Sequence, residues 1–142
     1  MSPNQIQLVQ QSWTRIQPIA EPAAVLFYQR LFELDPSLRA MFRRDMKEQG
    51  RLLMQMIAVA VKSLSDLERL IPAVQALGRR HSGYGVTEQH YATVGEALLW
   101  TLDKGLGDAF DDQMREAWTA AYVTLAKTMQ AAAQETTEAA VA

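Results

Sequence analysis

Apolar residues recur at steps of three and four along almost the whole chain of 142 residues, which is the spacing of one face of an α-helix. No stretch alternates between apolar and polar residues for more than a few positions, so the sequence predicts no β-strands. Proline and glycine divide the helical pattern into segments with short links. We therefore predict an all-α domain of about seven helices, which begin near Pro3, Pro22, Pro36, Asp45, Ser65, Thr87 and either Asp108 or Asp111.

Several of these helix starts carry capping signals. Ser2 is a predicted N-cap, and Thr87 is a predicted cap for the sixth helix. Asp45–Glu48 and Ser65–Glu68 both have the spacing of a capping box. At the other end of the chain, the alanine- and glutamate-rich tail from about position 134 is expected to fray.

The composition is that of one soluble globular domain spanning residues 1–142. Apolar residues make up 49% and charged residues 21%, and the formal net charge is -2 without any basic patch for nucleic acid. The apolar runs are too short to span a membrane, and we expect a cytoplasmic protein without a signal peptide. Cysteine is absent, which excludes disulfides, thiolate metal sites and covalent haem attachment.

One of the two histidines ends the fifth predicted helix. His81 lies four residues after Leu77, on the same apolar face, and Gly83 and Gly85 end the helix soon afterwards. A neutral imidazole at this point could ligate a metal or an iron porphyrin. It could equally be a helix-end histidine that interacts with the last carbonyls and the negative end of the helix dipole.

Other kinds of active site find no support in the sequence. The glycine pairs follow helices, whereas a phosphate-binding loop follows a strand. No group of His, Asp and Glu residues has metal-ligand spacing, since His90 opens the next helix. Ser82 adjoins His81 but lacks the glycine-flanked turn of a hydrolase nucleophile.

The order and spacing of these segments resemble the globin family, in particular bacterial single-domain globins and the haem domain of flavohaemoglobins. The resemblance covers about residues 5–135. It rests on Trp13, LFYQRLFELDPSLRAMF from Leu26, LGRRHSGYGV from Leu77, HYATVGEALL from His90 and AWTAAY from Ala117.

This resemblance implies a globin fold around a non-covalent haem b. His81 would be the proximal iron ligand, and Phe42 would pack on the haem. Tyr28 and Gln49 would lie above the iron on the distal side, with Leu53 as an apolar lid. Further lining is expected from Ile57, Leu77, Val86, Tyr91, Val94 and Leu98.

The pair formed by Tyr28 and Gln49 also has a physical rationale. Dioxygen on ferrous iron carries partial negative charge, and both side chains are hydrogen-bond donors. Each bond should contribute on the order of 1 kcal/mol or more and slow oxygen release. Without the resemblance, Tyr28 would be a core tyrosine and Gln49 a solvated helix residue.

The sequence also narrows the choice of a sixth iron ligand. No histidine lies between Met1 and Arg80, so the bis-histidine coordination of neuroglobin-like relatives is not expected. His90 and nearby methionines stay open as alternatives.

On the proximal side, flavohaemoglobins place a tyrosine and a glutamate behind the histidine. Tyr91, ten residues after His81, matches the tyrosine, and Glu135, 17 after Trp118, matches the glutamate, with Glu138 as an alternative. A carboxylate bonded to the imidazole N–H would raise its basicity and favour redox chemistry.

Small residues are expected at one helix crossing. Ala24 and Gly50 fall where the second helix would cross the distal helix, and small side chains allow two backbones to approach closely. Glycine inside a helix otherwise costs about 1 kcal/mol relative to alanine.

Reversible O2 binding is the leading functional hypothesis, with NO and CO as further ligands. The alternative is a nitric oxide dioxygenase, in which bound O2 and NO give nitrate and leave ferric iron. Such an enzyme needs a reductant, which here would come from a separate flavin- and NAD(P)H-dependent reductase. An O2 or NO sensor is a third, weaker hypothesis.

Overall fold

The computed structural model describes residues 1–42, 45–83 and 87–141, with side chains described except at positions 67, 70, 81–83 and 133–141. Within these residues the chain forms helices and no strand, which confirms the all-α prediction. Short 3-10 helices span Gln17–Ile19, Pro36–Met41, Ser63–Asp66 and Gly107–Ala109. The α-helices are α1 (Pro3–Ile16), α2 (Ala20–Leu34), α3 (Met46–Lys62), α4 (Leu67–Gly83), α5 (Glu88–Leu106) and α6 (Asp112–Val141).

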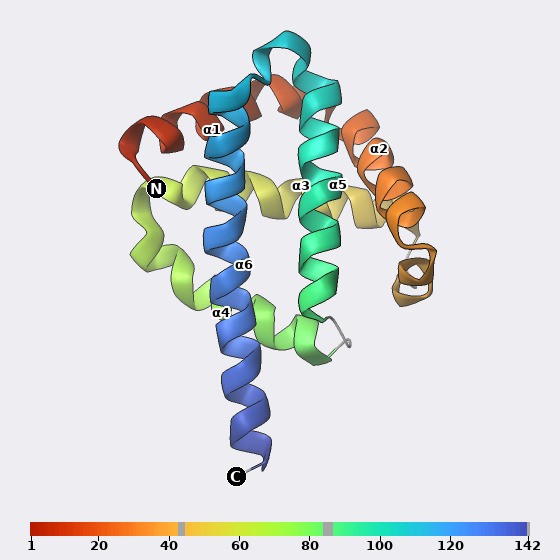
Figure 1. The fold of residues 1–142 in the computed structure, drawn as a ribbon, viewed down its shortest axis with the longest axis vertical. Coiled ribbons are helices and arrows are strands. Elements are labelled where there is room, and N and C mark those ends of the chain that lie inside the picture. Colours follow the sequence, from red (N-terminus) through yellow and green to blue (C-terminus); the bar gives the residue numbers. More distant parts are fainter. Residues whose placement is uncertain (43–44, 84–86, 142) are drawn as a thin grey trace.

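The helices pack across one another in two groups (Figure 1). Helix α6 packs against α4 and α1, while α2 packs against both α5 and α3. Helices α5 and α6 run side by side and in opposite directions. This arrangement brings α3, which carries Gln49, and α4, which carries His81, to the same side of the α5–α6 pair (Figure 1).

Two of the predicted caps are confirmed. The Ser2 hydroxyl accepts a hydrogen bond from the Gln5 N–H, and the Gln5 side chain accepts one from the Ser2 N–H. At α5, Thr87 caps the helix and the imidazole of His90 completes the capping box. Both boxes satisfy N–H groups that a helix leaves unpaired at its first turn.

The other two predicted capping boxes, at Asp45 and Ser65, are not observed as predicted. Helix α3 begins directly after Asp45, but the Asp45 side chain makes no capping hydrogen bond. Ser65 lies inside the 3-10 helix Ser63–Asp66, and its hydroxyl accepts a hydrogen bond from the Gln10 side chain. Side-chain contacts between helices therefore replace a local cap at Ser65.

Four helix boundaries also differ from the prediction. The third predicted helix is a 3-10 helix because the Asp35 carboxylate accepts a hydrogen bond from the Ser37 N–H and closes a tight turn. Helix α2 begins at Ala20, two residues before Pro22, which its first turn tolerates. Helix α5 passes through Gly105 and ends before Gly107, whose φ of +58° suits glycine. Helix α6 continues beyond position 134 to Val141.

The predicted crossing of α2 and α3 at small residues is confirmed. A Cβ atom built on Gly50 would lie 2.9 Å from the Cβ of Ala24, closer than such atoms approach in proteins. Gly50 and Ala24 are both buried. Their small size lets α3 lie directly on α2, and this contact brings the next residues of both helices together.

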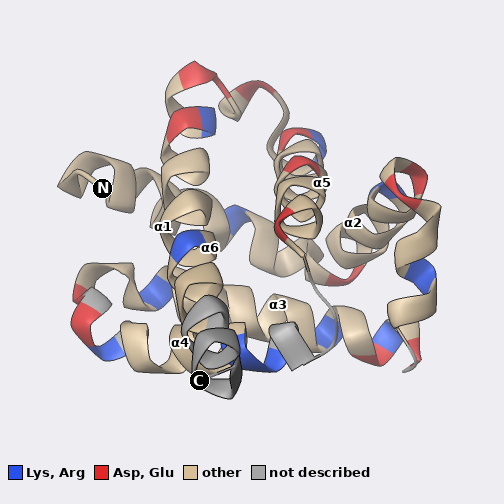
Figure 2. Cartoon of the chain, turned by 60° about the horizontal axis from the view of Figure 1, so that its bottom comes forward, with Lys and Arg blue, Asp and Glu red and all other residues tan. Residues whose placement is uncertain are grey.

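The charged residues follow no single face. Figure 2 shows Lys and Arg and also Asp and Glu on several helices, without separation into a wholly basic and a wholly acidic half. None of the described helices combines the length and the hydropathy needed to cross a lipid bilayer.

A buried hydrogen bond joins the first and last helices. The indole N–H of Trp118 donates to the hydroxyl of Ser12 at 2.9 Å, and the Ser12 hydroxyl donates to the Val9 carbonyl at 3.0 Å. Trp13 and Trp118 also pack with ring centroids 6.1 Å apart. Because Ser12 is 3% exposed, water cannot replace it as the acceptor.

We expect Ser12→Ala to lower the free energy of unfolding by about 1–3 kcal/mol, because the Trp118 N–H would be left buried and unpaired. Urea unfolding followed by circular dichroism measures this loss. The matched control is Thr14→Ala, which removes an exposed hydroxyl bonded to the Gln11 carbonyl on the same helix. Equal losses in the two variants would contradict the role given to the buried bond.

Candidate functional site

Tyr28 on α2 lies in an aromatic cluster and is 6% exposed. Its ring meets those of Phe27 and Phe42 edge to face, with centroids 5.0 and 5.4 Å apart. Gln49, in the first turns of α3, lies close enough to Tyr28 to act on the pKa of its hydroxyl. The two predicted distal residues are therefore brought together from separate helices.

The surroundings of Tyr28 keep its hydroxyl protonated. Burial raises the pKa of Tyr28 above its usual value of 10.0, and the nearby amide of Gln49 opposes this increase only in part. The phenol is consequently neutral at physiological pH, and its O–H can donate a hydrogen bond.

The apolar residues predicted to line the haem fall into two neighbouring clusters. Phe42, Leu53, Val94 and Leu98 pack on the buried group that contains Tyr28. Leu53 and Leu98 also pack on the main core, where they are joined by Ile57. The lining is thus drawn from α3, α5 and the chain just after the 3-10 helix Pro36–Met41.

The predicted iron ligand lies at the end of α4. The helix continues to Gly83, so the backbone of His81 is in its last turn, as predicted, while its side chain lies outside the described residues. Leu77 is half-buried on the same helix. Val86 lies outside the described residues, as do the side chains of Glu135 and Glu138.

The approach of α4 to α6 is fixed by a glycine that sequence reasoning did not identify. A Cβ atom on Gly78 would lie 2.2 Å from the carbonyl oxygen and 2.6 Å from the Cα of Met129. Only a residue without a side chain fits there. Gly78 is one turn before His81, so this contact sets the distance of the histidine-bearing turn from α6.

Tyr91, predicted to lie behind His81, has a buried polar atom. Its Oη is buried, and no described side chain or backbone group forms a hydrogen bond with it. Burial raises the pKa of Tyr91, so the group is a neutral donor. Such an unsatisfied buried hydroxyl is costly and marks a place where a further partner would be stabilising.

Tyr122 is a second tyrosine of this region, and it belongs to the segment AWTAAY that carries part of the resemblance. Its hydroxyl donates to the backbone carbonyl of Tyr91 at 2.5 Å. The ring occupies the space left by Gly95, where a Cβ atom would lie 2.9 Å from Cε2 of Tyr122. Burial, and then the neighbouring Tyr91, raise the pKa of Tyr122. Tyr122 therefore ties α6 to the first turns of α5.

His90 has a structural role in this arrangement. Its Nδ1 accepts a hydrogen bond from the Thr87 N–H at 3.0 Å, so the imidazole is engaged at the start of α5. Among the residues whose side chains are described, no three His, Cys, Asp or Glu residues form a group that could hold a metal ion.

The three tyrosines predict a loss of stability at alkaline pH. The unfolded chain releases its tyrosine protons near pH ~10, whereas Tyr28, Tyr91 and Tyr122 hold theirs more strongly in the folded state. Above that pH the unfolded state binds fewer protons, so the free energy of unfolding falls as pH rises. Urea unfolding at about pH 9 and pH 11 tests this. Tyr122→Phe should show a smaller loss over the interval, and equal losses would contradict its contribution.

A comparison with protein families identifies the fold. The Globin family model matches residues 25–129, which span most of the chain. The chain belongs to the globin family. Membership implies haem binding and the binding of diatomic gases, in agreement with the sequence resemblance.

Sequence relatives of this globin include both animal and bacterial proteins. A neuroglobin of Danio rerio is 32% identical over 136 residues, covering 86% of each chain. A flavohemoprotein of Vibrio cholerae is 38% identical over 104 residues, or 71% of this chain. The match spans only 26% of that flavohemoprotein, about a quarter of its length.

Solved structures confirm the globin fold. A bacterial globin from Campylobacter jejuni superposes with a TM-score of 0.83 at 27% identity, covering 96% of this chain and 99% of the other. An engineered carbene transferase of Rhodothermus marinus gives a TM-score of 0.89 at 23% identity, covering 100% and 99%. The latter likeness concerns the fold alone.

Proposed function

We propose that this globin holds haem b through His81 and binds O2 reversibly, with Tyr28 and Gln49 as donors to the bound gas. The observation that carries the proposal is the approach of Gln49 on α3 to Tyr28 on α2. Tyr28 is buried inside an otherwise apolar cluster. Such a pair suits the recognition of a small polar ligand in a dry pocket.

The residues of this chain fit the group that the family implies. Phe42, Leu53, Val94 and Leu98 offer apolar surface beside Tyr28. On the side of the haem where His81 is predicted, the unsatisfied Oη of Tyr91 would gain a hydrogen-bond partner if the predicted set of His81, Tyr91 and Glu135 forms. A haem held between these groups supplies a ferrous iron that takes O2, NO or CO as a ligand.

The distal side chains would act through hydrogen bonding and exclusion of water. The neutral phenol of Tyr28 would donate a hydrogen bond to the ligand through its O–H, and the Gln49 amide would donate one through its N–H. The two side chains would already lie close together before the ligand enters, so little reorganisation would be needed. The preference for O2 over the less polar CO follows from these donors.

The second candidate is a nitric oxide dioxygenase, which the relationship to a flavohemoprotein favours. In that case NO and O2 would be converted to nitrate, and a flavin- and NAD(P)H-dependent reductase would have to supply the electrons. A carboxylate from Glu135 on the imidazole of His81 would favour this chemistry by raising ligand basicity.

Absorption spectra of the haem-loaded protein test the proposal. The ferric, dithionite-reduced and oxygenated forms are recorded, and NO is then added to the last. A five-coordinate ferrous spectrum and a stable oxygenated form are expected. Rapid conversion to the ferric form with stoichiometric nitrate would favour the dioxygenase. Repeated turnover in the presence of a reductase would then be measured. A six-coordinate ferrous spectrum, or no haem uptake at all, would contradict reversible O2 binding.

A further inference from the structure

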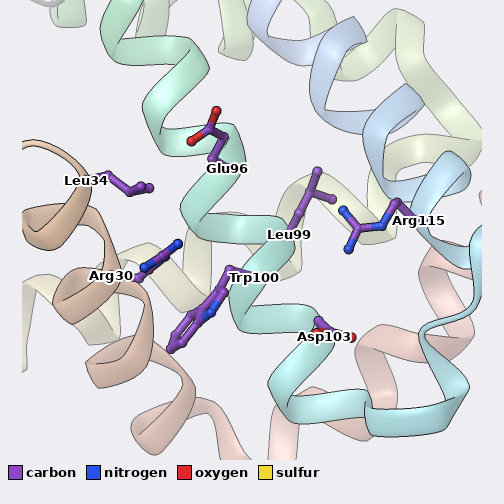
Figure 3. Close-up of a pocket in the computed structure, with 7 residues that line it drawn as sticks. All are labelled: Arg30, Leu34, Glu96, Leu99, Trp100, Asp103 and Arg115. Atoms are coloured by element: carbon purple, nitrogen blue, oxygen red, sulfur yellow. The ribbon is translucent and has the colours of Figure 1, made fainter.

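A half-open cavity of about 240 Å³ is lined by residues of α2, α5 and α6 (Figure 3). Arg30 lines it from α2, only two residues after Tyr28, and residues two apart on a helix point in different directions. The cavity is therefore separate from the cluster around Tyr28.

The lining of this cavity combines both charge signs with apolar surface. Two guanidinium groups, Arg30 and Arg115, point toward its middle from opposite sides (Figure 3). Two carboxylates, Glu96 and Asp103, come from α5. The remaining lining is apolar or aromatic and consists of Leu34, Leu99 and Trp100.

Most of these charges are unpaired. Among the described residues, Glu96, Asp103 and Arg115 form no ion pair within 4.0 Å, and Arg30 pairs only with Glu33 outside the cavity lining. The Nε of Arg30 is buried and has no hydrogen-bond partner in the described part of the chain. A buried donor without an acceptor is costly, so an acceptor arriving in the cavity would be stabilising.

Two cationic groups lie near the ring of Trp100. The guanidinium carbon of Arg30 lies 5.4 Å from the centroid of the Trp100 ring, and the Nζ of Lys104 lies 5.6 Å from it. These contacts hold the Arg30 head beside the indole. A carboxylate beside Trp100 could accept hydrogen bonds from the Arg30 guanidinium, which is already held in place.

We propose that this cavity binds a small zwitterion with an aliphatic group, of the class of the α-amino acids. The ligand carboxylate would accept from Arg30, and its ammonium would donate to Asp103 or Glu96. Its side chain would lie on Leu99 and Trp100. Because the two guanidinium groups and two carboxylates sum to zero charge, the lining favours a zwitterion over a simple anion or a simple cation.

The test uses the protein as purified, labelled with ¹⁵N, and follows the three indole N–H resonances by NMR. Trp100→Phe assigns the signal of Trp100. L-leucine is titrated first, followed by 4-methylpentanoate, which lacks the ammonium, 3-methylbutylamine, which lacks the carboxylate, and sulfate. We expect L-leucine to shift the Trp100 signal saturably and the other three probes to bind at least about tenfold more weakly.

Two variants locate the binding to the cavity. Arg30→Gln and Asp103→Asn should each weaken L-leucine binding about tenfold, since each removes one charged partner. The matched control is Arg39→Gln, an exposed arginine that lies over the Phe32 ring outside the cavity. It should leave the affinity unchanged. If Arg30→Gln fails to fold, Asp103→Asn and the probe series decide alone.

Several outcomes would overturn the proposal. Equal binding of 4-methylpentanoate or sulfate would make the cavity an anion site, and equal binding of 3-methylbutylamine would make it a cation site. No shift of Trp100 at any soluble concentration of L-leucine would mean that no such site exists. Haem loading is not required, so failure here leaves the proposed gas binding untouched.

Discussion

Replacing Tyr28 by phenylalanine is expected to raise the O2 dissociation rate constant of the haem-loaded protein about tenfold to a hundredfold. The variant keeps the ring that packs on Phe27 and Phe42 and removes only the hydroxyl. A hydrogen bond to a ligand with partial charge contributes about 1.5–3 kcal/mol, and each 1.4 kcal/mol corresponds to about a factor of ten. Stopped-flow displacement of O2 by excess CO measures the rate.

The matched control for this prediction is Tyr122→Phe, which makes the same chemical change on α6. Its hydroxyl bonds to the Tyr91 carbonyl and does not contact Gln49. We expect its O2 dissociation rate to stay within about a factor of two of the original. An unchanged rate in Tyr28→Phe, or an equal change in the control, would mean that Tyr28 does not donate to the ligand.

Gln49→Leu extends the same experiment to the second donor. Because Tyr28 and Gln49 lie close together and would share one ligand, the two substitutions should not be additive in a double-mutant cycle. The raised pKa of Tyr28 further implies that the rate is flat between about pH 6 and pH 9, since the phenol stays neutral over that range.

The sequence predicted the helices because apolar spacing marked each of them. The resemblance placed Tyr28 near Gln49, and the structure brings these two residues close together, while their role beside a haem stays a prediction. The crossing of Ala24 and Gly50 was also predictable, since both residues are small and fall at matched places along α2 and α3. Such features can be predicted from local residue spacing or from the known order of segments in a family.

Other contacts between distant helices escaped prediction because neither partner has a distinctive pattern of its own. Nothing in the sequence pairs Tyr122 with the space above Gly95. The Asp45 cap failed for a related reason, since spacing suggests a capping bond but the side chain makes none. The distances between helices depend on the whole packing, which no segment encodes alone.

Gly78→Ala is expected to lower the free energy of unfolding by about 3 kcal/mol, although helix propensity alone predicts a gain of about 1 kcal/mol. The new Cβ atom would overlap the Met129 carbonyl oxygen and Cα. These are backbone atoms that cannot rotate away, so α4 and α6 must separate. A decrease in the free energy of unfolding would show that the backbone contact outweighs helix propensity, and an increase would show the reverse. Urea unfolding measures this change.

Gly105→Ala is the matched control, because it adds the same methyl group to a helix glycine. Its Cβ atom would meet Cδ1 of Ile16 at 2.7 Å, which is the end of a flexible side chain that can move. We expect a change within about 1 kcal/mol of the original. Since Gly78 lies one turn before His81, Gly78→Ala should also lose haem faster to an excess of apomyoglobin, whereas Gly105→Ala should not. Equal stability and equal haem retention in the two variants would show that the α4–α6 distance is not fixed at Gly78.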